Sequence, residues 1–343
     1  MASICNCLLP NGGIELVGEY KPPNDNDPIG LIVRLSASGE LVQTFGFQDS
    51  HPRRGEIPAS AAVNGGRVYV GMGDIEAMNG LNGVFQVFKI DDAGELVWSW
   101  GSFQKVAVSG LDSRNVKILE DADNNIWILG VTGHFTESRL VTRLLKLTPN
   151  GGILFSREYL ADGAFSSNAV SMVLNDNGGA TLLLNILPEQ GGLRQNGFIH
   201  LDANGNVLEA FQSTNQLGSR YSDFRKSTEQ PGFMLTGFEA SCTDSSLGVT
   251  TVARVDEDFT FGGANCDNFA PLSVIRNNVG ERRLEDGVLI DLEIETVPGG
   301  ALMPAPWTAL DLTCPVLTQT TYRWSTGGTT PEITPLSNWY APN

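Results

Sequence analysis

Residues 198–207, FIHLDANGNV, belong to a set of five similar segments that decides the fold class of this chain. The others are IVRLSASGEL (32–41), VFKIDDAGEL (87–96), LLKLTPNGGI (144–153) and VARVDEDFTF (252–261). Each has a basic side chain between apolar residues and then a polar turn, and in four of them a glycine precedes the next apolar run. Alternating apolar residues that stop at such a turn indicate a β-hairpin. The sequence therefore predicts the same hairpin five times.

The basic residue of each segment marks a repeat. The markers are spaced 54 to 57 residues apart, and they are Arg34, Lys89, Lys146, His200 and Arg254. Upstream of each marker lie an apolar strand, a tight polar turn and a further strand, so each repeat contains four short strands. Such a repeat is typical of a β-propeller blade, and almost no window has helical periodicity. We predict an all-β fold with a β-propeller of five four-stranded blades, or six if C-terminal strands complete another.

Two segments carry a resemblance to a known family. GFIHLDANGNVLEAFQS (197–213) and GVFQVFKIDDAGELVWSWGS (83–102) resemble the repeats of bacterial secreted and surface β-propellers. The resemblance covers residues 1–266 and implies the architecture. It does not imply an activity, because this fold carries binding proteins, hydrolases, lyases and scaffolds alike.

The markers stop after Arg254, and we expect residues 267–343 to form a separate C-terminal region. Within it, CPVLTQTTYRWSTGGTTPEITP (314–335) resembles the immunoglobulin-like or PKD-like modules of Bacteroidetes surface proteins, with Trp324 as the central core residue. The closing strand of such modules is missing. The region is therefore expected to be an incomplete β-sandwich-like module, a module that borrows a strand, or a tail that completes a blade. Trp339 and Tyr340 are predicted to contact a partner.

The charge of the chain limits its partners. Asp and Glu number 39 against 22 Lys and Arg, a net charge of −17. Such a field repels nucleic acid and anionic membrane surfaces, and no run approaches the roughly 20 apolar residues of a membrane helix. We predict protein partners or self-assembly through the C-terminal region, with glycans as a further option, and neither nucleic acid binding nor membrane insertion.

The five basic markers have two interpretations. Each could form an anion or sugar site in its blade, or each could pack its stem on a neighbouring blade while its head group bonds a carboxylate or a carbonyl. The histidine in the fourth copy suits packing better than a charge requirement. We therefore interpret the markers as structural cations, one in each blade.

Two smaller sites are predicted from spacing. Asp121, Asp123 and Asn125 place oxygen atoms at alternate positions, as calcium loops require, although tight turns prefer the same residues. Calcium is the one cofactor that the sequence suggests. Cys242 and Cys266 flank the fifth hairpin and are either a disulfide, which would indicate a location outside the cytosol, or two free thiols.

No catalytic motif is evident in the sequence. It contains no nucleophile elbow, no zinc-protease motif and no phosphate-binding glycine loop. We therefore predict an extracellular or cell-surface protein that acts by binding or assembly, such as an adhesin or a filament subunit, and not an enzyme. The alternative is a carbohydrate-active enzyme with carboxylates at the propeller mouth, for which Glu76, Glu137 and Glu189 in the variable loops are candidates.

Overall fold

The fold was analysed in a computed structural model of the chain. The structure describes residues 5–9, 11–20, 29–48, 55–77, 80–105, 116–134, 139–189, 194–213, 220–227, 232–240, 248–255, 269–278 and 288–291. All regular secondary structure in these residues is β-strand. The same residues include no helix of the length and apolarity needed to cross a membrane.

Five antiparallel sheets follow one another along the chain. Blade 1 contains β1 (Cys5–Leu8), β2 (Ile14–Tyr20), β3 (Ile29–Leu35) and β4 (Leu41–Gln48). Blade 2 contains β5 (Gly55–Val63), β6 (Gly66–Ala77), β7 (Gly80–Ile90) and β8 (Leu96–Lys105). Blade 3 contains β9 (Lys117–Glu120), β10 (Ile126–His134), β11 (Arg139–Leu147) and β12 (Ile153–Ala161). Blade 4 contains β13 (Ala164–Leu174), β14 (Ala180–Pro188), β15 (Gln195–Leu201) and β16 (Val207–Ser213). The described strands of blade 5 are β17 (Arg220–Lys226), β18 (Phe233–Ala240) and β19 (Gly248–Val255).

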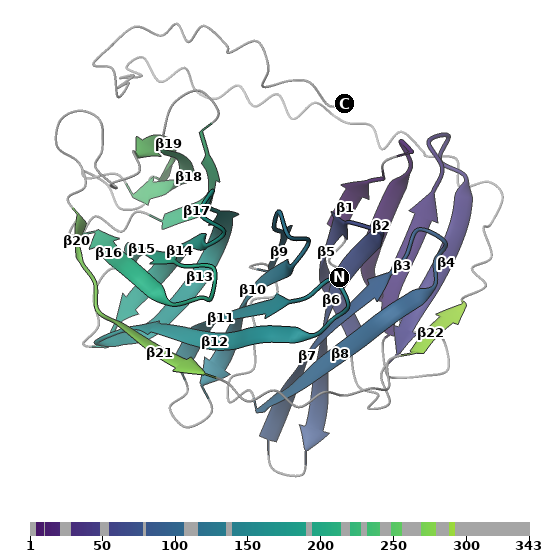
Figure 1. Ribbon diagram of the computed structural model, residues 1–343, viewed down its shortest axis with the longest axis horizontal. Helices are drawn as coiled ribbons and strands as arrows, with labels where there is room; N and C mark the ends of the chain where they lie inside the picture. The colour runs from purple at the N-terminus through teal and green to yellow at the C-terminus, as the bar shows by residue number, and fades with distance from the viewer. Residues whose placement is uncertain are drawn as a thin grey trace, which may run out of the picture.

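The blades are arranged as in a β-propeller. Within each blade, strands that are consecutive in the chain pair antiparallel, from the first strand to the last. The first strands of consecutive blades, β1, β5, β9, β13 and β17, pack against one another and form the inner side of the molecule. The blades follow an arc in chain order, with blade 1 and blade 5 at its two ends (Figure 1). The fold is therefore an all-β β-propeller, as the repeats predict.

The buried hydrophobic residues of the described ranges form four clusters, one between each pair of consecutive blades. The three consecutive leucines of β14 pack on both faces of their blade. Leu182 and Leu184 pack into the cluster shared with blade 3, whereas Leu183 between them packs into the cluster shared with blade 5. Successive residues of a strand point to opposite faces, so a strand with blades on both sides can bury consecutive apolar residues.

The turn between the third and fourth strands has the same form in blades 1 to 4. The first residue of each turn uses a side-chain oxygen to accept a hydrogen bond from the backbone N–H four residues later, at 2.7–3.1 Å. These first residues are Ser36, Asp91, Thr148 and Asp202. A glycine at the fourth position has a positive φ of 71° to 94°, which favours glycine over any other residue. These turns are the polar segments that follow the basic markers in the sequence.

The turn glycines also bring neighbouring blades together. A Cβ atom at Gly151 of blade 3 would lie 2.8 Å from the indole of Trp98 in blade 2, and one at Gly205 of blade 4 would lie 2.8 Å from the ring of Phe155 in blade 3. The Trp98 indole N–H donates a hydrogen bond to the Pro149 carbonyl at 3.0 Å. The last turn of a blade thus packs on an aromatic ring of the preceding blade.

Three short strands from the end of the described chain extend earlier blades. β20 (Phe269–Pro271) pairs with β16 of blade 4, β21 (Val274–Asn278) with β12 of blade 3, and β22 (Val288–Asp291) with β4 of blade 1. After blade 5 the chain therefore returns along the outer edges of the blades (Figure 1). We call β20, β21 and β22 the return strands.

The return strands belong to the region that the sequence assigns to a separate C-terminal part. Within residues 269–291, every described strand pairs with a propeller blade. They add fifth strands to existing blades and do not form a sixth blade of their own. Residues 292–343, with Trp324, Trp339 and Tyr340, lie outside the described residues, and the immunoglobulin-like or PKD-like module stays a prediction for them.

Candidate functional site

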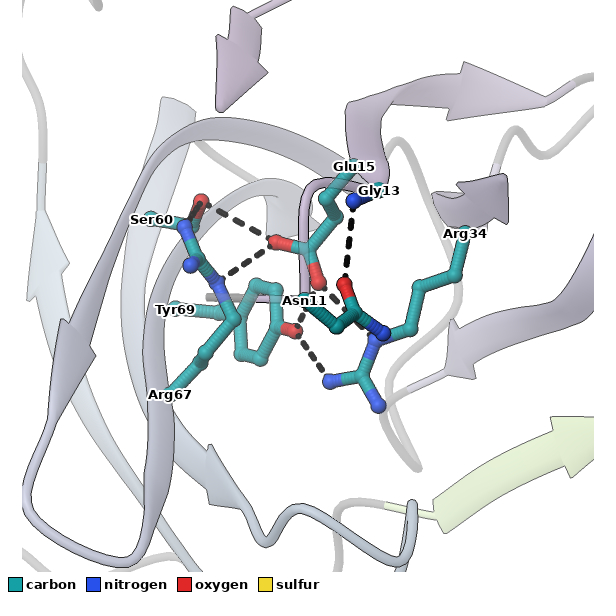
Figure 2. Close-up of polar contacts among 7 residues, drawn as sticks. All are labelled: Asn11, Gly13, Glu15, Arg34, Ser60, Arg67 and Tyr69. Carbon is teal, nitrogen blue, oxygen red and sulfur yellow. Dashed lines mark hydrogen bonds and ion pairs between the residues drawn. The ribbon is translucent and has the colours of Figure 1, made fainter. Parts of the chain in front are cut away.

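The first of the predicted cations, Arg34, belongs to a buried polar network between blades 1 and 2 (Figure 2). The carboxylate of Glu15 lies at its centre, with Arg34 Nε at 3.0 Å and Arg67 Nε at 2.8 Å. Tyr69 donates a hydrogen bond to Glu15 at 2.7 Å, and Ser60 donates another at 3.3 Å. Burial, together with the charge of Glu15, raises the pKa of Tyr69, which therefore stays protonated.

The Glu15 network is closed to ligands. Glu15 and Tyr69 are fully buried, and Arg34 and Arg67 are at most 8% exposed. Glu15 and Arg34 come from β2 and β3, whereas Ser60, Arg67 and Tyr69 come from β5 and β6. The network joins two blades and presents no surface at which a substrate could bind.

Three of the other predicted cations, Lys89, Lys146 and His200, also contact protein groups. Lys89 Nζ donates to the Asn64 carbonyl at 2.7 Å. Lys146 Nζ donates to the Ala203 carbonyl of blade 4 at 3.2 Å and lies 4.4 Å from the centre of the Trp127 ring. His200 Nδ1 lies 3.2 Å from Thr181 Oγ1, and Arg254 occupies β19 opposite Met234. The contacts of Lys89, Lys146 and His200 lie within their own blade or reach the next blade.

Asp121, the first residue of the predicted calcium site, bonds several protein groups. Its Oδ1 accepts hydrogen bonds from the backbone N–H groups of Asp123 and Asn125 at 3.0 and 2.8 Å. Its Oδ2 accepts from the Asn125 amide and the Trp127 indole, and it lies 3.0 Å from Lys146 Nζ. Burial raises the pKa of Asp121, but these hydrogen bonds outweigh it and hold the pKa below its usual value. The lone pairs that a calcium ion would need are already used, and the ammonium group would repel the ion.

The other predicted residues lie outside the described part of the chain or at its surface. Cys242 and Cys266 lie outside the described residues, as do Glu137 and the side chain of Glu76. Glu189 is exposed just after β14. In the part of the chain that the structure describes, no three His, Cys, Asp or Glu residues are arranged to hold a metal ion.

A different group of polar residues gathers on the inner strands. Asp223 of β17 accepts a hydrogen bond from the hydroxyl of Ser171, on β13. Lys117 Nζ, at the start of β9, lies 3.3 Å from Asp223 Oδ1, and Arg225 Nε lies 3.6 Å from Asp223 Oδ2. We call these four residues the axial cluster. It brings together the inner strands of blades 3, 4 and 5.

The carboxylate of the axial cluster is ionised and reachable. Burial raises the pKa of Asp223, but the hydrogen bond from Ser171 and the charges of Lys117 and Arg225 outweigh it and lower the pKa. The side chains of Asp223 and Lys117 are 28% and 39% exposed, and that of Arg225 is 83% exposed. Such a carboxylate can accept hydrogen bonds from hydroxyl groups, take up a proton or stabilise a positive charge.

The axial cluster is absent from the sequence predictions. Repeat analysis finds residues that recur at one position, whereas Lys117, Ser171 and Asp223 each occur in a single blade. A usable signal is the segment RYSDFRK of β17, which is strongly polar for a strand on the inner side of a fold. The inner strands that contact β17 are set by how the blades are arranged in space, and the sequence of β17 alone does not show this arrangement.

Comparisons with known proteins give matches in structure alone. No protein-family model matches the chain, and no curated protein does. A GH43 endo-arabinanase from Bacillus licheniformis is 10% identical, with a TM-score of 0.34, over 75% of this chain and 94% of that one. An endo-arabinase from Bacteroides thetaiotaomicron is 9% identical, with a TM-score of 0.33, over 74% and 94%. A putative exo-β-1,3-galactanase from Bifidobacterium bifidum is 12% identical, with a TM-score of 0.27, over 86% and 92%.

These comparisons correct the functional prediction. The similar structures are carbohydrate-active enzymes by name, and none is an adhesin or a filament protein. The prediction of a non-catalytic protein that acts by adhesion or self-assembly through protein partners is therefore wrong. At 9 to 12% identity and TM-scores of 0.27 to 0.34, the comparisons assign no substrate and no catalytic residue to this chain.

Proposed function

We propose that the protein is a carbohydrate-active enzyme, a glycoside hydrolase, with its reaction centre at the axial cluster. The observation that carries this proposal is the carboxylate of Asp223, which is ionised, partly exposed and held by side chains from the inner strands of three blades. A ligand that binds where several blades converge can be contacted by all of them. Polar groups that converge from separate elements of a rigid scaffold are typical of binding and catalytic sites.

The chemistry of glycoside cleavage suits such a carboxylate. The reaction passes through a transition state in which the sugar ring carries positive charge. One carboxylate must be ionised to stabilise that charge, to attack the sugar or to activate water, while another carboxyl group protonates the leaving oxygen. Asp223 has the lowered pKa of the first role. The proton donor would be a different residue.

Ser171 and Lys117 act in this proposal as positioning residues. The Ser171 hydroxyl fixes the orientation of the Asp223 carboxylate, and the Lys117 ammonium keeps it deprotonated. Ser171 is 1% exposed, so its hydroxyl is held by packing as well as by the hydrogen bond. Arg225 is exposed and more loosely paired, which leaves its guanidinium able to contact a sugar.

The test is hydrolysis of a panel of polysaccharides that includes arabinan and β-1,3-galactan, two substrates suggested by the names of the similar structures. We expect Asp223→Asn to lower the rate by about 100-fold or more, and sodium azide to restore part of the activity of Asp223→Ala. The matched control is Asp176→Asn, which removes an exposed carboxylate that pairs with Lys226, a residue on the same strand as Asp223. Equal activity of Asp223→Asn and the wild type would contradict the role of Asp223. Failure to cleave or bind any glycan of the panel would contradict the function.

We also propose that the protein acts outside the cell and that residues after 291 hold the immunoglobulin-like or PKD-like module. Polysaccharides as substrates and the resemblance of residues 314–335 support this proposal. Mass spectrometry of protein isolated from its host would test it through the thiols of Cys242 and Cys266. A disulfide between them favours the location, and two reduced thiols would oppose it.

A further inference from the structure

Two arginines meet at one oxygen atom on the outer side of the propeller. Arg157 of β12 donates a hydrogen bond from Nη1 to Asn206 Oδ1 at 3.1 Å. Arg276 of the return strand β21 donates from Nη1 to the same oxygen. Asn206 belongs to the last turn of blade 4. Since both nitrogens bond one atom, the two guanidinium groups lie next to each other.

The register of the strands explains this meeting. Arg276 lies directly opposite Tyr159, and Arg157 lies two residues before Tyr159 on the same face of β12. That face packs against blade 4, because the Tyr159 hydroxyl donates to the Gly205 carbonyl at 2.7 Å. The guanidinium group of Arg157 also lies over the ring of Phe155, whose centre is 5.0 Å from the guanidinium carbon. The arrangement is therefore built into the junction of blade 3, blade 4 and a return strand.

The shared acceptor is neutral, so the hydrogen bonds to it do not offset the two positive charges. Among the described residues, neither Arg157 nor Arg276 forms an ion pair with a carboxylate. Burial raises the pKa of Asp202, but hydrogen bonds from Asn206 and Asn204 and the charge of Arg157 outweigh it, so Asp202 attracts Arg157 without forming an ion pair with it. Its Oδ1 accepts from the backbone N–H groups of Asn204 and Asn206, and its Oδ2 accepts from the Asn206 amide. Asp202 thus orients Asn206, whose Oδ1 points to the arginines.

Two adjacent guanidinium groups repel each other unless an anion lies between them. Each has five N–H donors in a planar fork that matches an oxyanion, and one donor of each is used by Asn206. Arg276 is exposed, so a ligand can reach the pair from solvent. The protein as a whole carries a charge of −17, so these two cations stand out from their surroundings.

We propose that Arg157 and Arg276 form a binding site for an oxyanion, that is, a sulfate, phosphate or carboxylate group. The oxyanion bonds the N–H donors that Asn206 leaves unused and offsets the charge of both arginines. Because the arginines come from β12 and β21, the bound group ties the return strand to blade 3 and, through Asn206, to blade 4. This site is separate from the axial cluster and does not depend on the proposed hydrolase activity.

The test is hydrogen exchange of the β21 backbone amides in the full chain, with sodium sulfate against sodium chloride at equal ionic strength. At a sulfate concentration ten times its Kd, linkage predicts about tenfold slower exchange of these amides. Arg276→Gln should abolish the effect. The matched control Lys226→Gln, which removes a cation elsewhere on the surface, should retain it. Repeating the titration with phosphate and with glucuronate distinguishes an inorganic ion from the carboxylate of an acidic sugar.

The hydrogen-exchange experiment has outcomes that support the oxyanion site and outcomes that exclude it. Slower exchange in sulfate that is lost in Arg276→Gln and kept in Lys226→Gln supports the site. Equal protection in chloride, or a response that survives in Arg276→Gln, would overturn it, as would no response to any of the three anions. If Arg157→Gln fails to fold, Arg276→Gln still decides the question, because Arg276 is exposed and contributes little to the core.

Discussion

Gly151 of blade 3 lies against the indole ring of Trp98 of blade 2, so close that a Cβ atom at position 151 would lie 2.8 Å from the ring. The two residues are 53 positions apart, close to the repeat length of the chain. The same relationship joins Gly205 to Phe155 in the next pair of blades. Neighbouring blades are thus joined through a turn and a ring, in addition to the clusters between their faces.

Substituting Gly151 by alanine should destabilise the protein more than the same change in an open turn. Gly151 has a φ of +78°, and the new methyl group would also overlap Trp98. Gly163 has a similar φ of +72° and nothing within 4 Å of the added Cβ. We expect a loss of about 2–4 kcal/mol for Gly151→Ala and about 1 kcal/mol for Gly163→Ala in urea unfolding. Equal losses in the free energy of unfolding would mean that the contact with Trp98 does not affect stability.

Substituting Glu15 by glutamine should leave two buried arginines without a counter-charge. Glu15 is fully buried between Arg34 and Arg67. Breaking a buried ion pair by removing one partner costs about 3–5 kcal/mol, and we expect a loss of this size in the free energy of unfolding. Tyr69→Phe, which removes one hydrogen bond from the same carboxylate, should cost about 1 kcal/mol. A Glu15→Gln variant as stable as the wild type would refute this view of the network.

His200 should make the protein less stable in mild acid. Burial lowers the pKa of His200, and the nearby charge of Glu209 offsets this only in part. The unfolded chain therefore takes up the proton first, and stability declines as the pH falls below about 6.5 towards the pKa of the folded state. We expect the melting temperature of His200→Gln to change less between pH 7 and pH 5 than that of the wild type. A parallel pH dependence in both proteins would exclude this role.

Removing the Ser171 hydroxyl should raise the pKa of Asp223. The lowered pKa contributes stability that is present above about pH 4, the ordinary value for an aspartate, and is lost as the pH falls through the folded pKa. In Ser171→Ala the Asp223 carboxylate loses a hydrogen bond to its charged form, so it should protonate at higher pH. Carbon-13 NMR titration of the Asp223 carboxyl group measures this directly. Lys117→Gln should shift the titration in the same direction, and an unchanged pKa in both variants would contradict the description of the cluster.

The repeated part of the fold could be predicted because each blade packs with the same types of residue at equivalent positions. The basic markers, the turn glycines and the apolar runs recur at one interval, so the five sheets follow from the sequence. The return strands could not be predicted in the same way. Val274–Asn278 reads as a strand, but its partner β12 lies more than 110 residues earlier and carries no complementary signal.

The functional prediction failed for a related reason. The repeats draw attention to the residues that blades share, and the shared residues hold the blades together. Lys117, Ser171 and Asp223 occur once each, so no pattern links them in the sequence. They meet only because β9, β13 and β17 occupy the same inner position in successive blades.

The return strands also have a consequence for how the protein is made. Synthesis on the ribosome proceeds from the N-terminus to the C-terminus, so blades 1, 3 and 4 are translated before the segments that pair with their outer edges. Until residues 269–291 leave the exit tunnel, β4, β12 and β16 expose backbone hydrogen-bonding groups to other nascent chains. Ribosome-bound chains stalled before residue 269 should therefore be captured by chaperones more strongly than chains stalled after the return strands have emerged.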